Sequence, residues 1–335
     1  MSNQASVKIG THDGVFHCDE ALACYLLKRL PQYKDGEIIR SRDTEKLNQC
    51  DIVVDVGSIY DPSKHRYDHH QSSFQLTLSS IFPKKDFGNV RLSSAGLVYA
   101  HFGHQIIADY LDWSKDDPKT DNVFDKVYEN FIKEIDAIDN GVSQYDGEPR
   151  YHIKTNLSSR VEMLKPAWNE PSDDKIMYER FLQASKLTGE EFMDRVNYYG
   201  KIWLPARVVV LEAFKKRFEY EPNGKILVIS QCVPWINHLF EIEKEHNVEG
   251  QVYFTVFFDK SWRVRGVPIT QNSFELRRPL IKQWRGLRDE ELSAVSKIDK
   301  CIFVHATGFI GGNHTMEGAL KMALACCNDT LVTQV

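Results

Sequence analysis

The chain lacks the features that mark membrane, exported or disulfide-stapled proteins. No apolar run approaches the ~18 residues that a membrane-spanning helix needs, and the opening residues 1–6 lack the charged-then-apolar pattern of an export signal. The seven cysteines are odd in number, scattered, and include no Cys-x-x-Cys pair. This usage indicates reduced thiols in an intracellular protein, with a cryptic mitochondrial leader left open as an alternative.

A basic excess is also absent. Lys and Arg total 42 against 47 Asp and Glu, which gives a formal net charge of -5. Proteins that coat nucleic acid usually carry a positive excess. We therefore expect any polyanion to bind in a local site, where metal ions supply positive charge. A short oligonucleotide, or a strand in a narrow channel, fits this charge better than a long polymer.

The length and composition favour two globular domains. The chain has 335 residues, 42% of them apolar and 27% charged, and single cores stop growing near ~250–300 residues. We predict an N-terminal catalytic domain over 1–165, a helical connector over 166–220 and a C-terminal substrate-binding domain over 221–335. Residues 143–188 are expected to be irregular.

Strands and helices alternate in the first third of the chain. Predicted strands cover 7–9, 37–40 and 51–56, and predicted helices cover 19–30, 95–102 (closed by Gly103) and 121–139. This alternation predicts an α/β fold whose N-terminal sheet is doubly wound and mostly parallel. On the last of these helices, Asp136 continues the spacing of Asp125 and Glu129 and is expected on a solvated face.

The last third predicts a smaller α/β domain, with a cleft between the two domains. Helices are expected over 189–203 and 205–217, strands over 225–229 and 301–304, a hairpin over 251–267, a glycine-rich turn, and a final helix over 315–327.

Imidazoles and carboxylates gather where the predicted N-terminal elements end. The set comprises His12, His17, Asp19, Asp55, Asp68, His69, His70 and Asp139. Each residue alone fits a loop histidine, a helix cap or a solvated turn. Because four separate segments each place such a residue at an element end, where open α/β sheets bind ligands, a shared metal site is favoured. The mixed donors suit Mn2+, Zn2+ or Mg2+, and favour Mn2+.

The order of these residues resembles the DHH phosphoesterase superfamily, and within it the melanocyte-proliferating-gene exonuclease family. The resemblance is carried by the segments 10–20, 67–71, 137–141 and 308–314, and also by 203–207 and 284–288. It spans residues 7–325. His17 stands where most superfamily members have the first aspartate of an Asp-x-Asp pair, with one additional residue in the spacing, and this departure is typical of the exonuclease branch.

The resemblance implies a role for each residue. The implied metal ligands are His12, His17, Asp19, Asp55, His69 and Asp139. Asp55 would bridge two ions, His70 would point at the scissile phosphate, and Asp68 would orient a neighbouring histidine. The implied cofactor is a pair of Mn2+ ions that clamp the attacking water and a phosphoryl oxygen, with Mg2+ or Zn2+ as alternatives. If only one of Asp136 and Asp139 is a ligand, the sequence does not distinguish them.

A C-terminal segment is the expected substrate loop. Gly311, Gly312 and His314 resemble the glycine-rich substrate motif of the superfamily, and glycines let backbone N–H groups approach a phosphate. Arg263 and Arg265 could hold further phosphates, and the solvated face of a hairpin is an equally good interpretation of both.

The resemblance implies a 3′-to-5′ exonuclease that removes nucleotides from single-stranded RNA or a short oligonucleotide by two-metal water attack. One alternative is a phosphatase or phosphodiesterase for pyrophosphate or cyclic dinucleotides, and another is a non-catalytic metal-bound scaffold. No membrane partner is expected, and self-association into a homo-oligomer is left open. The cytoplasm or nucleus is the expected compartment, with mitochondria implied by the resemblance.

Overall fold

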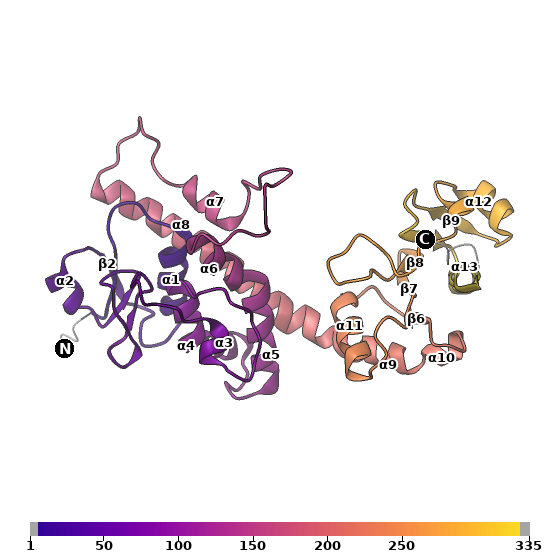
Figure 1. The fold of residues 1–335 in the computed structure, drawn as a ribbon, viewed down its shortest axis with the longest axis horizontal. Coiled ribbons are helices and arrows are strands. Elements are labelled where there is room, and N and C mark those ends of the chain that lie inside the picture. Colours follow the sequence, from indigo (N-terminus) through magenta and orange to yellow (C-terminus); the bar gives the residue numbers. More distant parts are fainter. Residues whose placement is uncertain (1–5, 329–335) are drawn as a thin grey trace. The chain divides into compact units, whose positions relative to one another are not determined.

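The computed structural model describes residues 6–328. Residues 1–5, on which the leader prediction partly rests, and 329–335 lie outside the described residues. The chain divides into two compact units, Met1–Lys201 and Ile202–Val335 (Figure 1). In the described residues, no helix is both long and apolar enough to cross a membrane.

The first unit alternates strands and helices before it becomes helical. Its strands are β1 (Lys8–Thr11), β2 (Glu37–Arg40), β3 (Ile52–Val54), β4 (Tyr60–Asp61) and β5 (Arg66–Tyr67). Its helices are α1 (Cys18–Lys28), α2 (Thr44–Asn48), the 3-10 turn η1 (Pro62–Lys64), α3 (Leu78–Ile81), α4 (Ser94–Leu111), α5 (Pro118–Val127), the π-helical segment η2 (Tyr128–Ile132), α6 (Lys133–Asp139), α7 (Leu157–Glu162) and α8 (Asp174–Asn197).

The sheet of the first unit has the order β2-β1-β3-β5-β4. β1 pairs in parallel with β2 and β3, β3 pairs in parallel with β5, and the edge strand β4 is antiparallel. Leu47, Cys50 and Val53 pack together on one face of this sheet, whereas α1 contacts β3 and α4 contacts β5. The α/β fold class and its mostly parallel N-terminal sheet are therefore confirmed.

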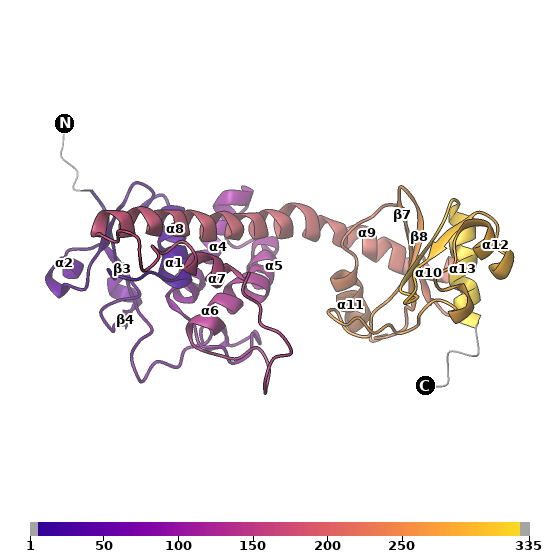
Figure 2. The same ribbon diagram turned by 90° about the horizontal axis from the view of Figure 1, so that it is seen from above.

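Helix α8 begins fifteen residues before the helix that the sequence predicts at residue 189. Asp173 caps α8, and its carboxylate accepts a hydrogen bond from the Ile176 N–H at 2.8 Å. The buried side chains of α8 include Phe181, Ala184, Phe192 and Val196, so the helix has an apolar stripe that packs on α1 and α5 (Figure 2). The prediction of an irregular 143–188 is wrong over this part, because tertiary burial outweighs the weak helix propensity of Ser185, Thr188 and Gly189.

A glycine on α8 gives a prediction about stability. A Cβ at Gly189 would lie 2.0 Å from Cγ of Tyr25 on α1, so Gly189→Ala forces the two helices apart. Overpacking costs about 1–3 kcal/mol, and the gain in helix propensity is about 1 kcal/mol. We expect urea denaturation to show a free energy of unfolding that is lower by up to about 2 kcal/mol. The exposed Glu179→Ala on the same helix should change it by less than about 0.5 kcal/mol, and an equal effect of both variants would contradict this packing.

The second unit has a mixed sheet. Its helices are α9 (Leu204–Lys215), α10 (Arg217–Tyr220), α11 (Ile236–Glu245), the 3-10 turn η4 (Lys282–Trp284), α12 (Asp289–Ser296) and α13 (Met316–Asn328), and the π-helical segment η3 (Tyr198–Trp203) spans the boundary between the units. Its strands are β6 (Ile226–Ile229), β7 (Phe254–Asp259), β8 (Ser261–Gly266), β9 (Cys301–Val304) and β10 (Ile310–Asn313).

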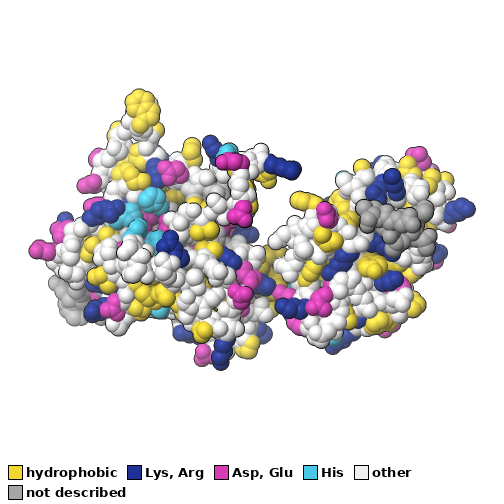
Figure 3. Space-filling view, in the orientation of Figure 1, with side chains coloured by type: hydrophobic (Ala, Val, Ile, Leu, Met, Phe, Trp, Pro, Cys, Tyr) yellow, Lys and Arg dark blue, Asp and Glu magenta, His cyan; other side chains and the backbone are white. Residues whose placement is uncertain are grey.

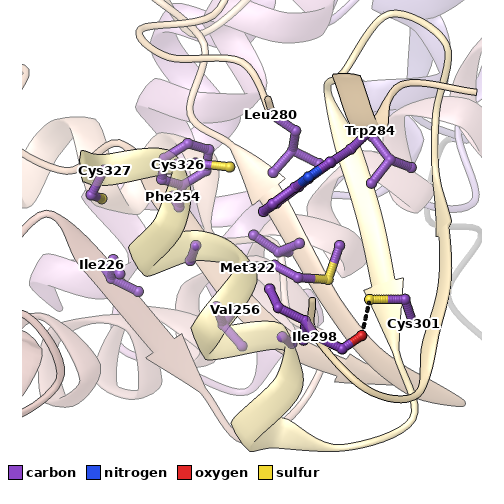
Figure 4. Packing of buried hydrophobic residues seen from close by; sticks show 14 of the residues in the cluster. Ile226, Phe254, Val256, Leu280, Trp284, Ile298, Cys301, Met322, Cys326 and Cys327 are labelled. Atoms are coloured by element: carbon purple, nitrogen blue, oxygen red, sulfur yellow. Dashed lines mark hydrogen bonds between the residues drawn. The ribbon is translucent and has the colours of Figure 1, made fainter. Parts of the chain in front are cut away.

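The strand order in the second unit is β6-β7-β8-β10-β9. β6 and β7 are parallel and the other pairs are antiparallel, so the predicted hairpin over 251–267 is confirmed. One face packs on α13 through Val256, Val264 and Met322 (Figure 4). Side chains from α9 and α11 pack with Leu227 and Phe257 in a separate core.

Two local predictions are wrong. Helix α4 continues through Gly103 to Leu111; the missing Cβ at position 103 leaves room for the rings of Tyr99 and Phe124, from which a Cβ would lie only 2.9 Å away. The expected glycine-rich turn is instead strand β10, in which Gly311 and Gly312 are buried. Gly311 pairs with Val264, and its missing side chain leaves room for Leu280 and Met322.

Candidate metal centre

Three neighbouring parallel strands of the first unit end in polar side chains at one edge of the sheet. His12 directly follows β1, Asp55 directly follows β3, and Asp68 directly follows β5. β1, β3 and β5 are adjacent in the sheet. Their carboxyl ends therefore bring together residues that are far apart in the sequence, at the edge where open α/β sheets bind ligands.

His69 and His70 follow Asp68 in the loop after β5, and two helix ends supply further donors. His17 occupies the N-cap of α1, Asp19 and Glu20 lie in its first turn, and Asp139 is the last residue of α6. Asp19 and Glu20 are 1% and 0% exposed, because α1 is buried on nearly all sides. Carboxylates this deeply buried are unfavourable unless they are paired or bound to a cation.

His69 lies at the centre of one group of donors. Its Nε2 is 3.1 Å from Asp139 Oδ2, 3.4 Å from Asp55 Oδ1 and 3.8 Å from Asp19 Oδ2. This nitrogen is buried, yet none of these carboxylates is aligned to form a hydrogen bond with it. Donor atoms that converge without bonding to one another are the arrangement expected around a cation.

His12 forms the centre of a second group. Its Nε2 is 3.2 Å from Glu20 Oε1 and 3.4 Å from Asp55 Oδ2, and its Nδ1 is 2.9 Å from the Asp13 carbonyl oxygen. With the proton on Nδ1 donated to that carbonyl, Nε2 is the ligand atom. Asp55 thus faces His69 with one oxygen and His12 with the other.

The donor separations fit divalent cations. Adjacent ligands of an octahedral ion at about 2.1 Å are about 3.0 Å apart, and those of tetrahedral zinc at about 2.0 Å are about 3.3 Å apart. The observed separations of 3.1–3.4 Å around His12 and His69 lie close to these values. Three groups of donors, each within 4.8 Å, could hold an ion. They are His12–His17–Glu20, Asp55–His69–His70 and Asp19–His69–Asp139.

The pKa shifts of these residues also indicate a site for cations. Burial disfavours the charged imidazoles, but Asp55 and Glu20 raise the pKa of His12 to about 10, and Asp139 and Asp55 raise the pKa of His69 to about 11. Burial alone would raise the pKa of Asp55, yet both histidines outweigh it and hold that pKa below its ordinary value. Protons on two imidazoles therefore supply the positive charge that the carboxylates need, and cations can take their place.

Asp68 and His70 form a separate pair beside this centre. Asp68 is 1% exposed, and its carboxylate accepts hydrogen bonds from the Ser58 N–H at 2.5 Å and from His70 Nδ1 at 2.7 Å. The His70 side chain is 58% exposed. The hydrogen bond to Asp68 raises the pKa of His70 despite partial burial. Asp68 thus orients the histidine that faces solvent.

These residues line a pocket of about 830 Å³ in the first unit. His12, His17, Asp19, Asp55, Asp68, His69, His70 and Asp139 all line it, so the structure brings every predicted ligand together with both predicted catalytic residues. Arg42 and Arg91 line the same pocket. Figure 3 shows the histidines gathered at one place on the first unit, with Lys and Arg side chains beside them.

Sequence reasoning missed several residues at this site. Glu20 lies in the motif at 10–20 but is not among the predicted ligands. Its Oε1 is 3.2 Å from His12 Nε2. The Ser94 hydroxyl donates to Asp55 at 3.2 Å, and the Ser94 and Ala95 N–H groups donate to Asp19 at 3.0 and 2.6 Å. The only sequence signal for this contact is that Ser93 and Ser94 cap a helix, which leaves N–H groups free for an anion.

Asp136 corrects an expectation. It is 0% exposed rather than solvated, and it lies outside the groups that could hold an ion. The π-helical segment Tyr128–Ile132 precedes it. The carboxyl group of Asp136 faces the start of α4, where the Ser93 N–H donates to it at 2.9 Å, so packing between α4 and α6 buries it. Asp139, by contrast, lines the pocket.

The predicted substrate-binding residues lie in the second unit. Arg263 and Arg265 project from β8, Gly311 and Gly312 lie on β10, and the exposed His314 follows β10. Gly312 pairs with Arg263, and a Cβ at position 312 would come within 2.8 Å of Arg263 Nη1. The guanidinium therefore reaches across a bare glycine, and its Cζ lies 5.2 Å from the ring centre of Phe303.

Comparisons with known proteins agree with the motif resemblance. A family model described as uncharacterised protein family UPF0160 matches residues 8–326. A protein named MYG1 exonuclease from Bos taurus is 52% identical over 326 residues, which cover 96% of this chain and 84% of that protein. One of the same name from Homo sapiens is 51% identical over 325 residues, which cover 96% and 86%. A MYG1 protein from Dictyostelium discoideum is 47% identical over 330 residues, which cover 97% and 98%.

Among solved structures, one of exonuclease RecJ bound to manganese aligns over 98% of this chain and 92% of its own, with a TM-score of 0.26 and 11% identity. This likeness is too low to bear on fold or function. The family match and the relatives, which extend over nearly the whole chain, establish that the chain belongs to the MYG1 exonuclease family, described as UPF0160.

Proposed function

We propose that the protein is a metal-dependent 3′-to-5′ exoribonuclease that acts on single-stranded RNA. The observation that carries this proposal is the convergence of His12, Asp55 and His69. Their donor atoms are 3.4 Å apart, close to the separation of adjacent ligands on one ion. Relatives about half identical to this chain are named exonucleases. The 3′-to-5′ direction and the RNA substrate are what the motif resemblance implies.

The proposed metal ligands are His12, His17, Asp19, Asp55, His69 and Asp139, with Glu20 beside His12. We propose two ions, Mn2+ in preference to Mg2+ or Zn2+, because imidazoles and carboxylates are mixed. When bound, such ions lower the pKa of water and polarise a phosphoryl oxygen. Asp55 is suited to bridge the ions, because its two oxygens face different histidines.

The chain's own side chains then handle the substrate. His70 presents a partly exposed imidazole whose Nδ1 is held by Asp68, which leaves Nε2 to contact the scissile phosphate or the leaving oxygen. Arg91 and Arg42 line the same pocket and would counter phosphate charge. Arg263, Arg265, Gly311, Gly312 and His314 are the proposed contacts to the substrate in the second unit.

A hydrolysis assay tests the function. Metal-free protein is given Mn2+ with single-stranded RNA labelled at either end, the matching DNA, pyrophosphate and a cyclic dinucleotide. We expect 5′-labelled RNA to shorten one nucleotide at a time, and the reaction to stop with EDTA. Release of phosphate from pyrophosphate alone would replace the nuclease with a phosphatase. Metal binding without turnover of any substrate would favour a scaffold.

His314→Ala tests the second unit's role. His314 is exposed, and its backbone N–H, which the substitution keeps, donates to the Lys300 carbonyl at 3.0 Å, so we expect the fold to tolerate the loss of the imidazole. Loss of one hydrogen bond to a charged phosphate costs about 1.5–3 kcal/mol, so we expect KM for RNA to rise at least about tenfold with kcat nearly unchanged. The control is the exposed His305→Ala, whose imidazole bonds Thr307 in its own turn. An unchanged KM in His314→Ala would contradict the substrate role.

A further inference from the structure

A second buried carboxylate lies behind the metal centre without contacting it. Asp136 is 0% exposed, and its Oδ2 has no hydrogen-bond partner. Its carboxyl group packs against the backbone of Gly96 on α4, where an added Cβ would lie 2.2 Å from Oδ1. α4 and α6 can approach this closely only because position 96 is glycine.

Ser93 links this carboxyl group to a proposed ligand. The Ser93 N–H donates to Asp136 Oδ1 at 2.9 Å. The Ser93 Oγ lies 2.7 Å from the same Asp136 oxygen and 2.5 Å from Asp19 Oδ1. Asp19 also accepts hydrogen bonds from the Ser94 and Ala95 N–H groups. The first residues of α4 thus lie between two acids from different helices.

The number of available hydrogens determines the direction of the hydrogen bonds between Ser93 and the two acids. A serine hydroxyl has one hydrogen to donate, yet its oxygen is within hydrogen-bond distance of two carboxyl groups. Burial raises the pKa of Asp19, but Asp19 also accepts hydrogen bonds from two further N–H groups, and as a proposed metal ligand it is ionised when the cation is bound. The Ser93 hydrogen therefore belongs to Asp19, and the other short contact needs a hydrogen on Asp136.

The surroundings of Asp136 agree with this assignment. An ionised carboxylate would place a charge in a fully buried position where no donor is aligned on Oδ2, with the Tyr128 hydroxyl as a further polar neighbour, and this is unfavourable. Burial raises the pKa of Asp136 to about 7. A hydroxyl that accepts a hydrogen bond from Asp136 must donate its own hydrogen to Asp19.

We propose that Asp136 is a positioning residue for the metal centre: through Ser93 it fixes the orientation of the Asp19 carboxylate, and it does so as a neutral carboxylic acid. This inference rests on the proposed metal centre. It assigns Asp136 no contact with metal or substrate. Its effect reaches the centre only through the Ser93 hydroxyl.

The test is a calorimetric titration of metal-free protein with Mn2+. Partners that orient a metal ligand are worth about 10–100-fold in affinity, so Asp136→Ala and Ser93→Ala should each raise the Kd at least about tenfold. Asp136→Asn offers Ser93 either an amide oxygen, which cannot donate to Oγ, or an NH2 group, which cannot accept from the Ser93 N–H, so its Kd should also rise. A control on the same helical run is Asp125→Asn, whose carboxylate pairs with Lys85 at 2.6 Å and should not alter the Kd.

The infrared spectrum provides a second readout. With Mn2+ bound, the wild type should show the C=O band of a buried protonated carboxyl group, and Asp136→Asn should lack it. An unchanged Kd in folded Ser93→Ala or Asp136→Ala would overturn the positioning role. Absence of this carboxylic acid band would overturn the neutral acid. If Asp136→Ala does not fold, Ser93→Ala and Asp136→Asn decide. Absence of Mn2+ binding by the wild type would instead remove the proposed function itself.

Discussion

Asp55→Asn is expected to abolish Mn2+-dependent hydrolysis of RNA while the protein stays folded. The two oxygens of Asp55 lie 3.4 Å from His12 Nε2 and 3.4 Å from His69 Nε2. An amide keeps one oxygen and replaces the other by an NH2 group, which cannot bind a cation. Loss of a bridging ligand removes several kcal/mol of transition-state stabilisation, which corresponds to a rate lower by about a thousandfold or more.

Asparagine is the appropriate replacement at this position. Asp55 has φ of 59°, in the left-handed region that Asn and Asp tolerate better than other residues with a side chain. A matched control is Asp112→Asn, because Asp112 also has a positive φ (57°) but is exposed at the end of α4. We expect the control to keep full activity and Mn2+ affinity. A fully active Asp55→Asn enzyme would mean that the metal centre is assigned to the wrong residues.

The sequence predicts three of the five strands of the N-terminal sheet, and it misses the two-residue strands β4 and β5. The strand over 37–40 matches β2, and those over 7–9 and 51–56 match β1 and β3 within a few residues. Apolar runs bounded by turns need no tertiary information. The strands also predict the site, because side chains that directly follow parallel strands lie at one edge of the sheet. The sequence alone therefore placed His12 and Asp55 in one site.

Helix phase could not be predicted in the same way. The spacing of Asp125, Glu129 and Asp136 assumes an uninterrupted α-helix with one packed face, but Tyr128–Ile132 is π-helical and α6 packs on both α1 and α4. Asp136 is buried against Ser93 and Gly96 of α4. This contact joins segments far apart in the sequence, so spacing along one helix could not predict it.

Residues whose role depends on tertiary contacts could not be predicted from the sequence either. Gly103 predicts a helix end from sequence, whereas in the structure it makes room for the rings of Tyr99 and Phe124 within a continuous helix. Glu20 stands in an expected motif, yet its approach to His12 depends on how α1 meets the loop after β1. Local sequence fixes which groups are available, and packing fixes which of them share a site.

His70→Ala is expected to separate chemistry from metal binding. The His70 side chain is 58% exposed, and its Nδ1 lies 2.7 Å from Asp68 Oδ1. Asp68 therefore fixes the orientation of the ring and leaves Nε2 available to the substrate. The pKa of His70 is raised chiefly by Asp68, which keeps more of the imidazole protonated near neutral pH, ready to stabilise phosphate charge or protonate the leaving oxygen. Loss of such a group costs about 10²–10⁴-fold in rate.

The measurements are kcat on end-labelled RNA and Kd for Mn2+ on the same His70→Ala preparation. We expect kcat to fall by at least about a hundredfold and the Kd to change by less than about threefold, because His69 and not His70 lies within 3.8 Å of Asp19 and Asp139. His152→Ala, at an exposed loop position, is the control and should change neither. His70 Nδ1 also lies 3.5 Å from Asp55 Oδ1, so a parallel loss of Mn2+ affinity and rate would make His70 a ligand instead and would transfer the phosphate contact to another residue of the pocket.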